Sequence, residues 1–156
     1  MRRRSTWLVI VTTVYLLGAL VVGLWPTPVD RALRHLISAA LGHLHRSGLP
    51  GSYDAIEFTA NIFFFVPIGL LVCLLLSRRL WPLAVVLGAL LSGAIELSQL
   101  LFLPARFASW NDVLANTIGT VIGVLIALVA RGIRSARMRR PGRTLSGASR
   151  ATSAAR

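Results

Sequence analysis

Long apolar runs, separated by short polar segments, make up most of the chain. Four of these runs are about 20 residues long, and a helix of that length crosses the ~30 Å hydrocarbon core of a bilayer. The pattern therefore predicts an all-α, polytopic membrane protein with a single transmembrane domain over residues 1–130. The four predicted transmembrane helices cover residues 6–25, 58–76, 80–103 and 113–130.

Two further segments differ from the predicted spans. Residues 29–46, which lie between prolines and glycines that break helices, place apolar side chains at helical spacing. This spacing predicts an amphipathic helix on the outer surface, between spans one and two. Its three histidines lack a convincing acidic partner, so we expect no metal and no other cofactor. Residues 131–156 are rich in arginine, serine, alanine and glycine, which predicts a basic, disordered cytoplasmic tail.

The arginines predict how the chain is oriented in the membrane. The chain has a net charge of +12, and its 17 basic residues are all arginines. They lie in short clusters beside the spans, where they set topology and contact anionic lipids, so we expect membrane lipids as partners and no nucleic acid. With the N-terminus in the cytoplasm, 13 arginines lie inside and four lie outside. The positive-inside rule therefore predicts a multi-pass protein of the cell membrane with both termini in the cytoplasm.

Polar side chains inside the spans are the candidate functional residues. An ionisable group at bilayer depth costs about 2.5–3.5 kcal/mol, so it needs a partner or a polar cavity. Because successive spans run antiparallel, three short polar stripes fall at similar depth in the outer half, below a loop arginine. We expect one polar cluster that opens outward. The candidate ligand-binding residues are Glu57 and Asn61 at the outer end of span two, Ser92, Glu96 and Gln99 in span three, Arg106 in the loop, and Asp112 and Asn116 at the outer end of span four.

These polar residues leave two interpretations open. Their hydrogen bonds alone could hold the bundle together, or they could form a ligand site whose catalytic candidates are Glu96, Asp112 and Arg106. Four other residues are expected to shape the helices. Pro67 removes a backbone hydrogen bond from span two, and three glycines permit close helix approach. These glycines are Gly69, Gly119 and Gly123.

The same positions carry a resemblance to a known family. The segments "NIFFFVPIGLL", "SGAIELSQ" and "RFASWNDVLANTIGTVIG" resemble three motifs of the VanZ-like family, in the family's order. The resemblance spans residues 54–123, and the motifs match Asn61, Phe65, Pro67, Gly69, Ser92, Glu96, Gln99, Arg106, Asp112, Asn116 and Gly119. It implies a small bacterial cell-envelope membrane protein, in a family named for a link to low-level resistance to teicoplanin, a lipoglycopeptide antibiotic.

Three kinds of function fit these expectations. The first is an outward-facing pocket that binds the head group of a lipid, a lipid-linked glycan or a lipoglycopeptide. The second is an intramembrane enzyme that modifies an envelope lipid, with a carboxylate as general base and Arg106 holding an anion. The third is a small transporter or channel, which four spans would form more readily as an oligomer. The sequence does not decide between an oligomer and a monomer.

Overall fold

The computed structural model describes residues 2–25, 38–39, 41–43, 46, 53–103 and 109–138, with side chains from residue 6 onward. Four long helices make up most of this part of the chain. They are α1 (Arg2–Gly23), α3 (Tyr53–Leu75), α4 (Trp81–Phe102) and α5 (Trp110–Met138), and a short 3₁₀ helix, η2 (Arg78–Leu80), joins α3 to α4. Within the described residues there is no strand, so the prediction of an all-α protein is confirmed.

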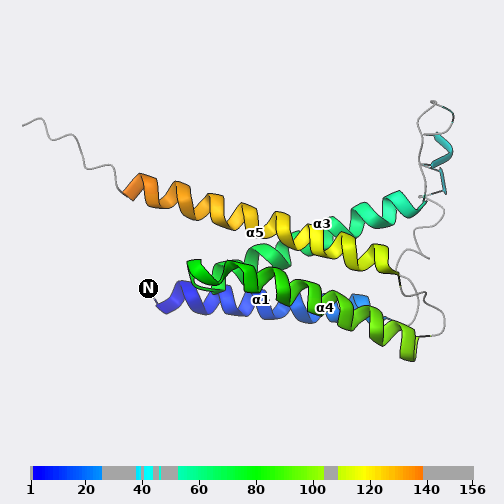
Figure 1. Cartoon of the computed structure of the whole chain (residues 1–156), viewed down its shortest axis with the longest axis horizontal. Helices are drawn as coiled ribbons and strands as arrows, with labels where there is room; N and C mark the ends of the chain where they lie inside the picture. The colour runs from blue at the N-terminus through cyan, green and yellow to red at the C-terminus, as the bar shows by residue number, and fades with distance from the viewer. Residues whose placement is uncertain are drawn as a thin grey trace, which may run out of the picture.

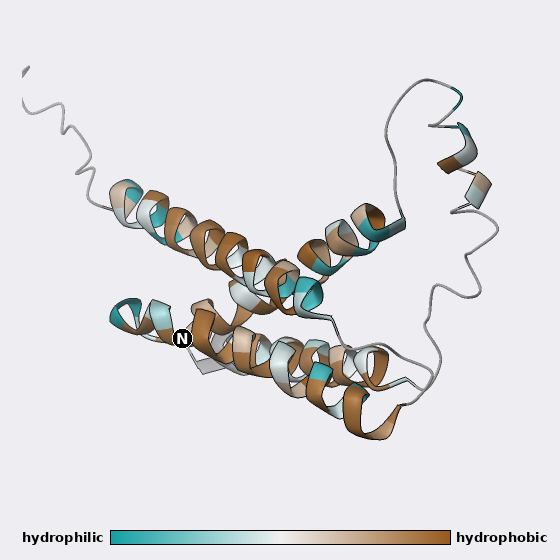
Figure 2. Cartoon of the chain, turned by 45° about the vertical axis from the view of Figure 1, so that its right-hand side comes forward, coloured by the Kyte–Doolittle hydropathy of each residue, from teal (hydrophilic) through white to brown (hydrophobic). Residues whose placement is uncertain are grey.

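The predicted membrane spans agree with these helices. All four helices are long and apolar enough to cross a bilayer, and apolar residues predominate along their middle parts (Figure 2). The clearest difference is at α5, which continues to Met138, eight residues beyond the predicted end of span four. The predicted amphipathic helix lies largely outside the described residues, although those described between residues 38 and 46 are helical. The predicted tail from residue 139 onward lies outside them as well.

The helices form two pairs that run in opposite directions. Helices α1 and α4 run in the same direction and end at the same side of the molecule, where α3 and α5 begin (Figure 1). Helix α5 crosses α3, and the C-terminal end of α5 returns to the side from which α1 starts (Figure 1). The two described chain ends therefore lie on one side of the bundle.

Glycines allow α3 and α5 to touch backbone to backbone. A Cβ atom added to Gly119 would collide with the carbonyl oxygen of Ile62, and one added to Gly123 would collide with that of Val66. From α3, a Cβ on Gly69 would collide with the carbonyl of Thr120. Small residues at four-residue spacing let membrane helices approach in this way. Three of the predicted structural residues therefore lie in the closest contact of the fold.

Helix α1 packs against α3 and α4 through an apolar cluster of Ala19, Phe65, Ile68 and Ile95. One polar contact adds to it, because the Tyr15 hydroxyl donates to the carbonyl oxygen of Phe64 at 2.9 Å. Pro67 is inside α3 and has no N–H to give the carbonyl of Phe63, which weakens the helix ladder here. The Tyr15 hydroxyl thus reaches α3 at the stretch that the proline disturbs.

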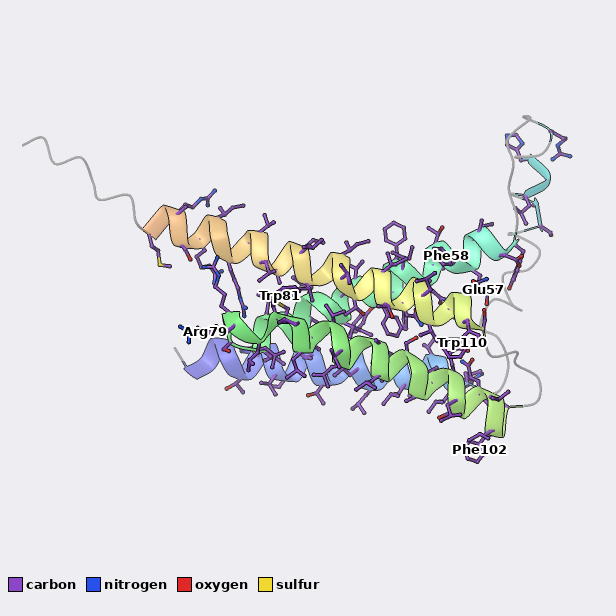
Figure 3. All side chains as sticks on the ribbon, in the orientation of Figure 1. Glu57, Phe58, Arg79, Trp81, Phe102 and Trp110 are labelled. Carbon is purple, nitrogen blue, oxygen red and sulfur yellow. The ribbon has the colours of Figure 1, made fainter. Side chains whose placement is uncertain are left out.

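The four tryptophans mark where the bundle meets the two surfaces of a membrane. Trp7 and Trp25 lie near opposite ends of α1, 18 positions apart, which is about 27 Å at 1.5 Å per residue. Trp81 and Trp110 lie at opposite ends of the molecule (Figure 3), and all four side chains are exposed. Exposed tryptophans concentrate at membrane–water interfaces, and the spacing matches the ~30 Å hydrocarbon core. The fold therefore places the start of α5 at the level of lipid head groups.

Candidate functional site

Glu96 holds the start of α5 in place from the neighbouring helix. Its side chain is 8% exposed in α4, and its Oε2 atom accepts a hydrogen bond of 2.8 Å from the backbone N–H of Ser109. Ser109 directly precedes α5, and its hydroxyl oxygen accepts from the N–H of Asn111 at 3.2 Å. Ser109 is therefore the N-cap of α5. The Glu96 carboxylate lies beside the positive end of the α5 dipole, an arrangement that favours negative charge.

A cavity of about 270 Å³ opens beside this carboxylate, between α4 and the first turn of α5. Among the described residues that line it, all side chains other than Glu96 and Ser109 are apolar or aromatic, and Trp110 is 86% exposed at its edge. The lining residues are Gly93, Glu96, Leu97, Leu100, Ser109, Trp110 and Val113. Because Leu97, Leu100 and Trp110 are also exposed on the outside of the bundle, the cavity opens on the outer surface of the helices.

Ser92 and Asn116 form a second polar contact, deeper between α4 and α5. The Asn116 amide nitrogen donates to the Ser92 hydroxyl oxygen at 2.8 Å, and both side chains are buried. The Asn116 carbonyl oxygen Oδ1 is buried and has no hydrogen-bond partner among the described residues. One turn further along, the Thr120 hydroxyl donates to the Asn116 backbone carbonyl at 2.9 Å. The hydrogen bond between Asn116 and Ser92 joins two of the predicted site residues and also connects α4 to α5.

Gln99 faces a different neighbour from the other residues of its stripe. Its amide nitrogen donates to the backbone carbonyl of Gly23 at 2.8 Å, so it caps the last turn of α1. A helix leaves its last four carbonyls without partners in the helix, and this bond satisfies one of them. Gln99 does not line the cavity beside Glu96. The structure therefore gives it an architectural contact with α1.

Three other predicted site residues, Glu57, Asn61 and Asp112, lie at the same end of the molecule but do not line this cavity. Glu57 is exposed on the first turns of α3, at the end where Trp110 lies (Figure 3), and Asn61 is half-buried one turn later. Asp112 is half-buried in the first turn of α5. Arg106, the predicted cation of the site, lies outside the described residues.

Three structural residues, Thr120, Gly88 and Arg131, were not predicted from the sequence. The Thr120 side chain is fully buried, and a Cβ atom on Gly88 of α4 would collide with it. Thr120 follows Asn116 by four residues and Gly88 precedes Ser92 by four, so extending both stripes by one turn would have found them. Arg131 makes a contact of another kind. Its Nη2 atom donates to three backbone carbonyls at the end of α3, those of Cys73, Leu74 and Leu76.

The described residues offer no obvious metal site. No group of three or more histidine, cysteine, aspartate or glutamate side chains among them is placed to hold an ion. Among the described lining residues, the polar chemistry of the cavity comes from the Glu96 carboxylate, the Ser109 hydroxyl and backbone, and the indole of Trp110. Such a set can accept hydrogen bonds and attract positive charge, and its apolar walls can hold the adjoining part of an amphiphile.

Comparison with protein families agrees with the motifs. The family described as VanZ/LLP1 matches residues 10–131, which include α3, α4, most of α1 and α5, and the whole candidate site. The chain belongs to the VanZ/LLP1 family. No curated protein and no solved structure matches the chain. The VanZ/LLP1 match begins inside α1, so it extends the resemblance beyond the three motifs of α3, α4 and α5.

Proposed function

We propose that this VanZ/LLP1 protein binds the head group of a lipid, a lipid-linked glycan or a lipoglycopeptide in the cavity between α4 and α5. One observation carries the proposal, namely a buried carboxylate at the base of a cavity whose other walls are largely apolar. Insertion of a carboxylate into a membrane helix costs about 2.5–3.5 kcal/mol. Helix packing alone could use an amide instead, as Gln99 does.

The dimensions and position of the cavity also support an amphiphilic ligand. Its volume of about 270 Å³ lies near the lower end of the ~300–1,000 Å³ that is usual for small-molecule sites. A head group fits this space, while the chains of a lipid would remain along the exposed apolar surface of α4. Trp110 lies at the depth of the lipid head groups, so a ligand can enter directly from the bilayer.

We further propose that the cavity faces the outside of a bacterial plasma membrane, with both termini in the cytoplasm. The exposed arginines Arg78, Arg79, Arg134 and Arg137 lie on the helix ends opposite to the cavity. Basic residues beside membrane helices are retained in the cytoplasm, which supports this orientation.

Cysteine labelling will test the orientation. Single cysteines placed at the exposed positions Asp54 and Arg134 are expected to differ in how they are labelled in whole cells. A membrane-impermeant maleimide should label Asp54→Cys in intact cells, whereas it should label Arg134→Cys only after the cells have been permeabilised. The native Cys73 is fully buried, so the unmodified chain is the control and should not be labelled. Labelling of Arg134→Cys alone in intact cells would reverse the proposed orientation.

Filling the cavity should abolish binding without disturbing the fold. A Cβ atom added to Gly93, which lines the cavity, meets nothing within 4 Å, so Gly93→Leu places its side chain in open space. Gly18 of α1 has equally open surroundings far from the cavity, and Gly18→Leu is the matched control. Native mass spectrometry with a panel of bacterial envelope lipids and teicoplanin should show ligands on the wild type and on Gly18→Leu. We expect Gly93→Leu to bind these ligands about tenfold more weakly or worse, because the leucine side chain occupies the cavity.

The same panel separates binding from the other functions. Equal ligand retention by Gly93→Leu and the wild type would refute the cavity as the binding site. New lipid masses after incubation would indicate turnover and favour the enzyme interpretation. If lipoglycopeptide binding underlies a resistance role, a deletion strain carrying Gly93→Leu should be more sensitive to teicoplanin than one carrying Gly18→Leu.

A further inference from the structure

A second hollow in the surface lies on α5, beyond the cavity at the start of that helix. It is an open groove of about 390 Å³ along the C-terminal half of α5, which lies along one edge of the bundle in both views (Figure 1, Figure 2). We propose that this groove holds an acyl chain of an anionic phospholipid, whose phosphate binds Arg134 and Arg137. The described residues that line the groove are Ile122, Leu125, Ile126, Val129, Ala130 and Ile133.

The length of the groove matches the depth of one leaflet of the bilayer. Ile122 and Ile133 are 11 positions apart, which is about 17 Å at 1.5 Å per residue. One leaflet contributes about half of the ~30 Å hydrocarbon core. Ile122 follows Trp110 by 12 positions, or about 18 Å. With Trp110 at the level of one set of head groups, the groove begins near the midplane and continues through the opposite leaflet.

Two exposed arginines lie at the head-group end of the groove. Arg137 follows Ile133 by four positions and therefore lies on the same face of the helix, and Arg134 is one turn before Arg137. They are 24 and 27 positions beyond Trp110, or about 36–41 Å, in a bilayer that is about 40–45 Å thick with its head groups. A guanidinium group matches a phosphate with paired hydrogen bonds. Both arginines are thus at the depth of lipid phosphates.

Charge favours a lipid over a second copy of the chain. A copy related by a two-fold axis along the membrane normal would place α5 beside α5 in the same direction. Arg134 and Arg137 would then face the same arginines of the copy, and like charges side by side are destabilising. The chain after Met138 also suits the groove poorly, because Leu145 is its only large aliphatic residue and its charged side chains are all arginines. An anionic phospholipid provides both an apolar chain and a negative charge.

This lipid site is separate from the cavity beside Glu96, so it does not depend on the function proposed for that cavity. In the proposed orientation, the groove lies in the cytoplasmic leaflet, where anionic lipids attract basic segments beside membrane helices. The groove adds a more specific feature to this general attraction. It sets an apolar surface of leaflet length directly below two arginines.

The experiment compares two phospholipids with identical acyl chains, the anionic phosphatidylglycerol and the zwitterionic phosphatidylcholine. Binding of each to the full chain in detergent is measured by native mass spectrometry. Each arginine near the surface favours an anionic lipid about fivefold, so the wild type should bind phosphatidylglycerol at least about tenfold more tightly. Arg134→Gln combined with Arg137→Gln should remove most of this preference. Arg78→Gln combined with Arg79→Gln removes the same charge from the exposed η2 turn and is the matched control, which should retain the preference.

A second pair of variants tests the groove itself. Ala130→Trp places a large side chain in the groove, whereas Gly18→Trp places the same side chain on α1, where an added Cβ atom meets nothing within 4 Å. Ala130→Trp should weaken phosphatidylglycerol binding about tenfold, and Gly18→Trp should leave it unchanged.

Four outcomes would overturn the inference. Equal affinity of the wild type for the two lipids would show that the groove has no anionic ligand. Equal losses in the two double-arginine variants would indicate general attraction to the basic end of the bundle. Loss of phosphatidylglycerol in Gly93→Leu but not in Ala130→Trp would place the lipid in the cavity between α4 and α5. A dimer that Ala130→Trp dissociates and phosphatidylglycerol does not would assign the groove to a second copy of the chain.

Discussion

Replacing Gly123 with alanine is expected to destabilise the protein by about 3 kcal/mol, at the upper end of the usual cost of overpacking. The added methyl group would collide with the carbonyl oxygen of Val66 and would lie 2.6 Å from the backbone nitrogen of Leu70. Both obstacles belong to the α3 backbone, so no side-chain rotation can relieve them. The two helices would have to separate along their closest contact, and the neighbouring contact of Gly119 with Ile62 would open as well.

Helix α5 contains its own control for this prediction. A Cβ atom on Gly132 meets nothing within 4 Å, and alanine is favoured over glycine in a helix by about 1 kcal/mol. Gly132→Ala should therefore leave the thermal unfolding temperature in detergent unchanged or raise it, while Gly123→Ala lowers it by several degrees. Equal unfolding temperatures for the two variants would show that the α3–α5 contact is not as tight as the structure describes.

The second large effect is expected at Arg131, which joins the end of α3 to α5. Its Nη2 atom donates to the carbonyls of Cys73 and Leu76 at 2.8 Å and to that of Leu74 at 3.0 Å. A cation at a helix C-terminus also complements the helix dipole. Hydrogen bonds to charged groups contribute about 1.5–3 kcal/mol each, so Arg131→Met should cost on the order of 2–4 kcal/mol. The Nη1 atom is buried without a partner among the described residues, and its burial costs free energy in the wild type. Methionine removes that cost, which partly offsets the lost hydrogen bonds.

Limited proteolysis provides a local measurement of this loss. Arg78 and Arg79 follow the end of α3 in the exposed η2 turn, and trypsin cleaves after arginine. Arg131→Met should fray the end of α3 and increase cleavage there several-fold. Arg134→Met removes an exposed arginine from the same helix and should not. Equal cleavage of the two variants would contradict the capping role of Arg131.

The sequence predicted the helices well because membrane insertion leaves few alternatives. Each span must be apolar over about 20 residues and must satisfy its own backbone, so hydropathy alone locates it. The predicted span ended at residue 130, whereas the helix α5 continues to Met138. Arginines marked the end of the apolar span, but arginine is a good helix former, and Arg131 also bonds to α3. Charge signals where the membrane ends, which need not be where the helix ends.

The candidate site was less predictable, because helical spacing gives a face and not a partner. The stripe of Ser92, Glu96 and Gln99 was placed on one face of α4, and all three side chains are buried. Their partners lie on different elements, however. Ser92 bonds to a side chain of α5, Glu96 to a backbone N–H before α5, and Gln99 to a carbonyl of α1. Backbone partners carry no signal in the sequence, so two of the three contacts could not be read from it.

The spacing of the tryptophans has a consequence for how the protein responds to its bilayer. Trp7 and Trp25 fix α1 against both interfaces, and Gln99 fixes α4 to the end of α1. The depth of Glu96 is therefore set by the fixed length of α1 between its two tryptophans. In a membrane thicker than the ~30 Å that the tryptophans match, hydrophobic mismatch would draw the carboxylate below the head groups. Bilayer thickness would then control how easily a polar head group reaches the cavity.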